Sequence, residues 1–153
     1  MKRLSVIALL GLFFAASAFV ASTISANDVV GTYWNAEKTS KIRIYLAKNG
    51  KYYGKIEHLE TPNNSDGTPR KDDHNPNSKL QNRPLLGLVI MKSYEWNEDE
   101  QQWEDGTIYD PKGGKTYDGY MYFENGNKDV LKLRGYVMGM TWLGRTSEWT
   151  RIK

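Results

Sequence analysis

The sequence predicts an all-β fold, an antiparallel meander of about eight strands that closes into a small barrel. Short segments alternate apolar and polar residues, turn-forming residues separate them, and the chain contains 14 glycines. An open meander leaves two exposed edge strands, whereas closure removes them. A barrel of this size is filled by side chains or holds one small ligand. An open β-sandwich is the alternative architecture.

The first three strands are expected at residues 29–34, 41–46 and 51–59. In the second of these, Ile42, Ile44 and Leu46 share one face, as period-two alternation requires. Asn49-Gly50 separates the second strand from the third. This pair predicts a tight hairpin, because both residues tolerate positive φ.

Five further strands are expected at residues 85–96, 102–109, 115–123, 129–137 and 140–151. Turn signals separate them, among them Asp110-Pro111 and the glycines that follow. A polar segment at residues 60–84 interrupts the pattern. We expect a functional or irregular loop there, because loops of this length are uncommon in small domains. A helical turn is expected within it near residues 77–81.

The N-terminus has the features of a cleavable signal peptide. Lys2 and Arg3 precede an apolar segment, and small and polar residues follow it as far as Ala26, before Asn27. The apolar segment is shorter than the roughly 20 residues of a membrane span, and no charged stop-transfer segment follows. We therefore expect residues 1–26 to be a signal peptide and residues 27–153 to form one exported β-barrel domain, periplasmic or secreted.

Charge and cysteine content exclude several classes of function. Without Lys2 and Arg3 the chain has 19 basic and 18 acidic residues, so its net charge is only +1. Residues 27–153 contain no run of Lys and Arg of the kind that binds phosphates, so the sequence does not indicate nucleic acid as a partner. The chain has 0 cysteines, which excludes disulfides, thiol catalysis, thiolate metal sites and a lipobox anchor. We expect no cofactor, no membrane span and no lipid anchor.

Seven ordered motifs resemble a bacterial family of exported domains of unknown function, number 2147 of its series. The motifs are Tyr52-Tyr53-Gly54-Lys55-Ile56, Asp73-His74-Asn75-Pro76, Arg83-Pro84-Leu85-Leu86-Gly87-Leu88, Ile108-Tyr109-Asp110-Pro111, Gly114-Lys115-Thr116-Tyr117, Leu133-Arg134-Gly135-Tyr136 and Gly144-Arg145-Thr146 through Trp149 and Arg151. The resemblance implies a lipocalin-like, calycin-type barrel and no established activity.

The lipocalin pattern places Gly-x-Trp on the first strand and packs it against an arginine of the last strand. Here Tyr33 occupies the tryptophan position and Trp34 comes one residue late. A one-residue slip turns a side chain to the other face of a strand, so we expect Tyr33 to fill the closed end. Its cationic partner is expected to be Arg145 or Arg151.

The last strand places Arg145, Trp149 and Arg151 on one face at period two. With Tyr33 they are interpreted as a structural cluster in which a guanidinium stacks on an aromatic ring. An anion or sugar site at the barrel mouth is the alternative. The candidate ligand-binding residues lie elsewhere, where polar groups occur among aromatic ones: Arg83, Tyr109, Lys115, Tyr117 and Arg134.

The long loop gathers Asp72, Asp73 and His74. A catalytic His–Asp dyad is one hypothesis for these residues, but no nucleophile motif accompanies them. The oxygens do not have EF-hand spacing, and Asx-turns explain them as well, so no metal site is predicted.

The sequence is compatible with three functions. The first is an exported soluble barrel that binds a small amphipathic or apolar ligand without catalysis. The second is an envelope module with a solid barrel, whose loop contacts a protein or a glycan. The third is an enzyme that uses the loop dyad. A cavity of at least about 300 Å³ separates the first from the second.

Overall fold

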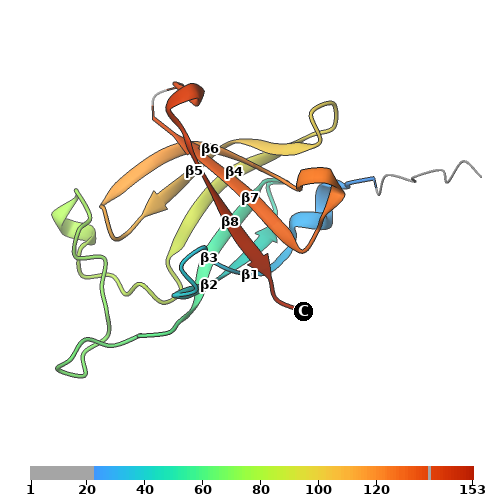
Figure 1. The fold of residues 1–153 in the computed structure, drawn as a ribbon. Coiled ribbons are helices and arrows are strands. Elements are labelled where there is room, and N and C mark those ends of the chain that lie inside the picture. Colours follow the sequence, from blue (N-terminus) through green and yellow to red (C-terminus); the bar gives the residue numbers. More distant parts are fainter. Residues whose placement is uncertain (1–22, 138) are drawn as a thin grey trace, which may run out of the picture.

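A computed structural model describes residues 23–137 and 139–153, and over these residues eight antiparallel strands form a closed barrel (Figure 1). The predicted fold class is confirmed. The expected signal peptide lies largely outside the described residues. The strands are β1 (Gly31–Trp34), β2 (Ser40–Leu46), β3 (Tyr52–Leu59), β4 (Val89–Asn97), β5 (Gln102–Asp110), β6 (Lys115–Tyr122), β7 (Val130–Tyr136) and β8 (Arg145–Arg151).

Closure of the barrel depends on the short first strand. β1 pairs with β2 along its length and with β8 through Tyr33↔Arg151 and Trp34↔Thr150. Every other strand pairs with its neighbours in chain order. Within the described residues no strand is therefore left with an open edge, which removes the aggregation hazard of an open meander.

Two strands begin later than their apolar sequence suggests. β4 begins at Val89, because Gly87 adopts φ +84° and the Leu88 amide donates to the Leu85 carbonyl in a turn. β8 begins at Arg145, because the preceding residues form the 3₁₀ helix η4 (Thr141–Leu143). Both segments were expected to be strand.

Short 3₁₀ helices occur at four places in the described chain. The expected helical turn in the long loop is confirmed as η2 (Ser78–Leu80), where the Asn77 side chain accepts from the Lys79 amide at 3.1 Å. η3 (Glu124–Gly126) joins β6 to β7. Val29, expected at the start of a strand, instead ends η1 (Ala26–Val29).

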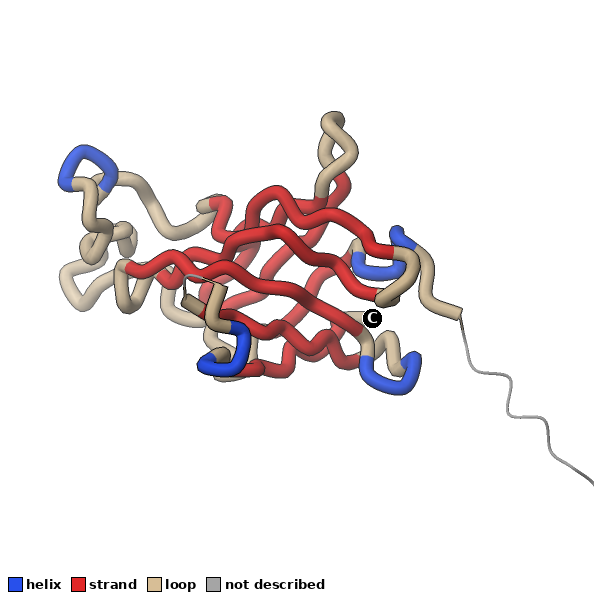
Figure 2. The backbone as a smooth tube through the Cα atoms, turned by 90° about the horizontal axis from the view of Figure 1, so that it is seen from above, coloured by secondary structure: helices blue, strands red, loops and turns tan. Residues whose placement is uncertain are grey.

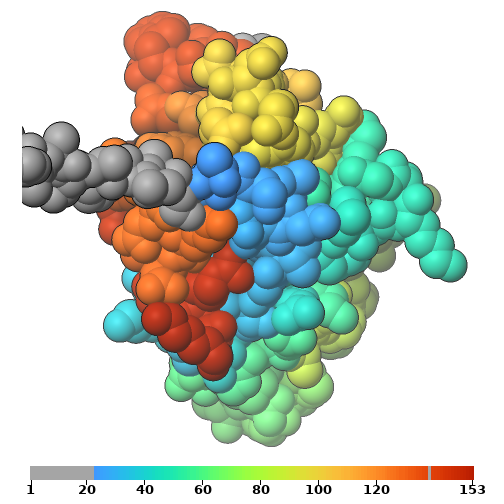
Figure 3. Space-filling model, turned by 90° about the vertical axis from the view of Figure 1, so that its right-hand side faces the viewer, coloured from blue at the N-terminus to red at the C-terminus, as the bar shows by residue number. Residues whose placement is uncertain are grey.

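η1 covers one end of the barrel, which is here called the closed end. Figure 3 looks onto this end, where the blue N-terminal segment lies among the orange, red and teal strands. Val29 is 0% exposed, and the Trp103 indole N–H donates to the Ala26 carbonyl at 2.9 Å. Ile24 is also buried. The packing of the domain therefore begins before Asn27, its expected first residue.

The other end carries the longest loops, including the segment between β3 and β4. Figures 1 and 2 show this segment extending from the end of the barrel opposite η1. The β1–β2, β5–β6 and β7–β8 connections lie at the same end, because successive strands are antiparallel. This end is here called the open end, and the candidate site lies there.

Candidate functional site

The open end leads into a cavity of about 1030 Å³. Its walls come from the inner faces of β2 to β8, and its mouth is formed by the β1–β2 connection and the ends of β5 to β8. The inner wall is largely aliphatic. Its residues are Ile42, Ile56, Ile90, Ile108, Leu133, Trp149, Ser40, Ser147 and Gly135.

A row of glycines on three neighbouring strands leaves room inside the barrel. Gly106 on β5 pairs with Gly119 on β6, which pairs with Gly135 on β7. The Tyr94 ring fills the space over Gly106, where an added Cβ would approach it within 2.3 Å. At Gly135 the nearest atom to an added Cβ is 3.6 Å away, so this part of the row stays open to the cavity.

Tyr94 also brings a polar atom into the interior. The residue is 0% exposed, and its hydroxyl has no hydrogen-bond partner among the described residues. The hydroxyl lies over Gly119, 3.1 Å from where a Cβ would be. Burial raises the pKa of the Tyr94 hydroxyl far above its usual range, so this group stays protonated.

Basic and aromatic side chains reach the mouth from two strands. Lys115 and Tyr117 line it from β6, and Arg145 lines it from β8. Arg145 pairs with Gly135, and Tyr117 pairs with Ile108. Arg145 and Tyr117 therefore lie on the inner face of the wall, as their cavity-lining partners do. The mouth thus combines two cations with a phenol hydroxyl.

Apolar side chains are exposed beside these cations. Val137 and Leu143 line the cavity and are 46% and 57% exposed, and the adjacent Trp142 is 75% exposed. All three belong to the β7–β8 connection or its edge. The mouth therefore has an apolar rim as well as a charged one.

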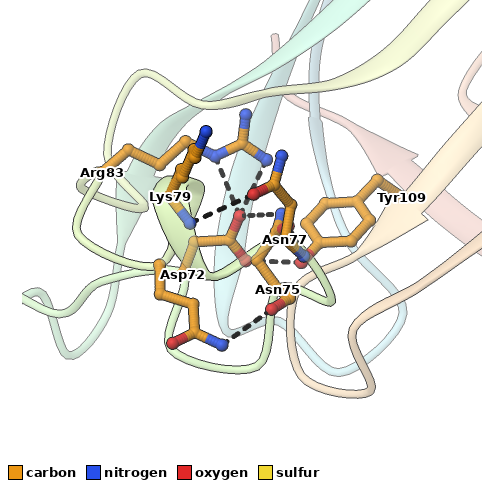
Figure 4. Close-up of polar contacts among 7 residues, drawn as sticks. Asp72, Asn75, Asn77, Lys79, Arg83 and Tyr109 are labelled. Atoms are coloured by element: carbon orange, nitrogen blue, oxygen red, sulfur yellow. Dashed lines mark hydrogen bonds and ion pairs between the residues drawn. The ribbon is translucent and has the colours of Figure 1, made fainter.

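The long loop is attached to the outside of the barrel through a buried carboxylate (Figure 4). Asp72 is 0% exposed. It accepts from the Tyr109 hydroxyl at 2.6 Å, from the Asn75 amide at 2.8 Å and from the Arg83 guanidinium at 2.7 Å. Burial and the neighbouring Asp72 carboxylate raise the pKa of Tyr109 to about 12.

The five predicted ligand-binding residues therefore occupy three different places. Lys115 and Tyr117 line the cavity. Tyr109 contributes to the lining, but its hydroxyl binds Asp72, as Arg83 does. Arg134 is on the outer face of β7, where it donates to the Thr146 hydroxyl at 3.2 Å and to the Thr141 carbonyl at 2.7 Å.

The residues of the expected structural cluster are also divided between the two ends. Arg151 lies over the Tyr33 ring at 4.7 Å in the closed end. Its guanidinium donates to the carbonyls of Lys128, Val30 and Asp28. These hydrogen bonds connect η1 to the β6–β7 connection. Arg145 instead lies at the mouth, and Trp149 lies between the two on β8.

The loop histidine does not form the dyad considered above. His74 Nδ1 is 2.7 Å from the Lys112 carbonyl oxygen, and Asp72 is occupied by the three partners described above. Within residues 23–137 and 139–153, no group of three or more His, Cys, Asp or Glu side chains could hold a metal ion. No helix of the described chain is long and apolar enough to cross a membrane.

Several residues of the cavity were not identified from the sequence. Gly135 and Ser147 were not singled out, and Ile42 was assigned only to a strand face. The available signal was the placement of three glycines on strands that pair in register, at Gly106, Gly119 and Gly135. Such glycines mark a close approach by another group or an open space.

An eight-stranded antiparallel barrel with one closed end and an internal cavity is lipocalin-like. The chain is similar to a solved structure described as "Protein HP1028 from the human pathogen Helicobacter pylori belongs to the lipocalin family". The TM-score is 0.68 at 24% sequence identity, over 86% of this chain and 85% of that chain. This similarity shows the fold.

The family follows from the sequence match. Residues 31–151 match the family described as "Uncharacterized protein conserved in bacteria (DUF2147)". The chain belongs to this family, which confirms the resemblance indicated by its motifs. Among curated proteins no match is found.

Proposed function

We propose that this protein is an exported, soluble barrel that binds a small apolar or amphipathic ligand in the cavity, without catalysis. The observation that carries the proposal is the cavity of about 1030 Å³ with an aliphatic inner wall. Ligand sites typically occupy about 300–1,000 Å³ and are mostly apolar, with a few polar groups that orient the ligand. The alternative of a barrel packed solid by its own side chains does not fit this volume.

The composition of the wall supports an apolar ligand body. Ile42, Ile56, Ile90 and Leu133 present aliphatic carbon, and burying apolar ligand surface against them contributes about 25 cal/mol per Å². Ser147 is a hydroxyl on the same wall, and its Oγ is 3.4 Å from the Leu133 carbonyl oxygen. The described interior therefore favours hydrocarbon over a charged solute.

The test is a titration with the neutral fluorescent probe N-phenyl-1-naphthylamine, read by energy transfer from the tryptophans, of which Trp149 is buried on the cavity wall. Gly135→Leu is the blocking variant. Gly135 does not have a positive φ, so its backbone accepts other residues. It also has space for a side chain, which would enter the cavity. Thr150→Leu adds a similar side chain on the exposed outer face of β8 and is the control.

We expect the probe to bind the wild-type protein and Thr150→Leu with equal affinity. A leucine side chain on the cavity wall should weaken binding to Gly135→Leu at least about tenfold, the equivalent of 1.4 kcal/mol. Melting temperatures show that each variant is folded. Absence of probe binding by the wild-type protein, or unchanged binding by a folded Gly135→Leu variant, would overturn the proposal.

A further inference from the structure

Two basic side chains, Lys115 and Arg145, line the cavity mouth. Lys115 and Arg145 form no hydrogen bond or ion pair within the part of the chain that the structure describes. Five other Lys and Arg side chains of the described chain form an ion pair with a carboxylate. These are Lys51, Arg83, Lys128, Lys132 and Lys153.

The two carboxylates at the mouth are turned toward their own loops. Asp110 Oδ1 accepts from the Lys112 amide at 3.0 Å, and its Oδ2 lies over Gly113, 2.8 Å from where a Cβ would be. Glu37 is 3.4 Å from the Asn35 side-chain amide. Although Asp110 and Lys115 are opposite each other in the register, no ion pair within 4.0 Å joins them. Neither carboxylate therefore forms an ion pair with Lys115 or Arg145, and both basic side chains are available to contact a ligand.

These cations are positioned to meet one end of a molecule inside the barrel. β6 and β8 flank β7, so Lys115 and Arg145 approach the mouth from both sides of that strand. Trp149 lies four residues deeper than Arg145 on β8, a separation of about 13 Å at roughly 3.3 Å per residue. Two basic side chains at the mouth thus stand above an aliphatic interior along one wall.

We infer that the ligand is a single-chain amphiphile with an anionic headgroup, which Lys115 and Arg145 bind at the mouth while the apolar tail lies along the aliphatic wall. This inference rests on the proposed function and names its ligand class. A carboxylate, sulfate or phosphate headgroup shares the required chemistry, since each accepts charge-assisted hydrogen bonds from an ammonium and a guanidinium. The Tyr117 hydroxyl, two residues deeper than Lys115, is a third donor.

The test compares ligands that share one tail and differ in headgroup charge. Dodecanoate, dodecanol and dodecyltrimethylammonium displace N-phenyl-1-naphthylamine from the wild-type protein below their micellar concentrations. We expect dodecanoate to bind at least about tenfold more tightly than the cation, which corresponds to 1.4 kcal/mol. The preference should decrease as salt is added, because the mouth is open to solvent.

Variants then assign the preference to particular side chains. Lys115→Gln and Arg145→Gln should each weaken dodecanoate about three- to tenfold, as expected for partly solvated charge pairs, and leave dodecanol unchanged. Lys112→Gln makes the same charge change on the exposed β5–β6 turn outside the cavity lining, and is the control. The double variant Lys115→Glu with Arg145→Glu should prefer the cationic ligand.

The outcomes separate this inference from the proposed function. If the probe and dodecanol bind but dodecanoate has no advantage, the headgroup inference is overturned and the cavity proposal stands. An equal effect of Lys112→Gln would also overturn it, because the preference would then reflect the general surface charge. If neither the probe nor any of the three ligands binds, the proposed function itself fails.

Discussion

Replacing Asp72 with Asn should loosen the long loop from the barrel while the barrel itself stays folded. The Asp72 carboxylate is 0% exposed and accepts hydrogen bonds from Arg83, Asn75 and Tyr109. An amide of the same shape removes the negative charge and replaces one acceptor oxygen by an NH₂ group, which faces either Tyr109 at the Oδ1 position or Asn75 and Arg83 at the Oδ2 position. The variant therefore removes the charge and one acceptor without creating a cavity.

The magnitude follows from the burial of each partner. Breaking a buried ion pair from one side costs about 3–5 kcal/mol. The Arg83 side chain is 33% exposed, so water can solvate its guanidinium in the variant and the cost is reduced. Tyr109 and Asn75 are buried, and an unsatisfied group of this kind costs about 1–3 kcal/mol. Since these losses share one network, we expect a total of about 2–4 kcal/mol.

Urea unfolding and hydrogen exchange measure this loss globally and within the loop. The loop amide to follow is that of Asp72, which donates to the Arg83 carbonyl at 3.0 Å. Asp73→Asn is the matched control, because Asp73 is the exposed neighbour and undergoes the same charge change. A surface change of this type alters stability by less than about 0.5 kcal/mol. The reasoning is refuted if the two variants unfold alike and the loop amides keep equal protection.

Two further perturbations test the loop and the closed end. The pKa of Tyr109, about 12, exceeds the ordinary value of 10.0. Stability from its protonated hydroxyl is therefore complete below pH 10 and lost as the pH rises toward 12. Tyrosinate absorbance, corrected with Tyr109→Phe, should show this pKa falling toward 10 in Asp72→Asn, and an unchanged pKa would contradict the assignment. A chain that begins at Asn27 lacks buried Ile24 and the acceptor of the Trp103 indole, so it should lose about 2–4 kcal/mol in urea unfolding relative to a chain that keeps this segment. Equal stability of the two chains would show that the segment does not contribute.

The order and number of strands could be predicted because alternation and turn residues are local signals. The misplaced strand ends show where local signals fail. Leu85 and Leu88 are apolar because they pack on the barrel from a turn, not because they belong to a ladder. Apolar residues predict buried positions, and such positions occur in turns as well as in strands. The register of the partner strand, which the sequence does not show, is needed to tell the two apart.

The candidate site was predicted less completely, for a reason of geometry. Lys115 and Tyr117 were identified because two-residue spacing keeps side chains on one face of a strand. Arg83 and Tyr109 are likewise a basic residue and a tyrosine. They nevertheless bind the Asp72 carboxylate of the folded loop, which is 37 residues from Tyr109 in sequence. Arg134 lies on the outer face because it alternates with Leu133 and Gly135. Composition alone does not distinguish these three environments.

The distribution of aromatic rings explains why a barrel with many tyrosines still has a cavity. The closed half contains Tyr33, Tyr52 and Trp103, and the Trp103 ring packs 6.4 Å from Tyr52 and 5.5 Å from Phe123. Other tyrosines pack on the barrel surface instead of filling its interior. They form stacked or tilted pairs, Tyr45 with Tyr53 and Tyr120 with Tyr136.

The open half, by contrast, contains isoleucines, a serine and Gly135 on its inner wall. Within the glycine row, Gly135 is the position that stays open to the cavity, because Tyr94 already occupies the space over Gly106 and approaches Gly119. A larger residue at Gly135 would fill part of the open half with a side chain. Stability should then rise as ligand binding falls, since a filled cavity regains the packing that an empty one lacks. The same substitution thus separates a barrel that keeps its cavity for a ligand from one that merely tolerates the empty space.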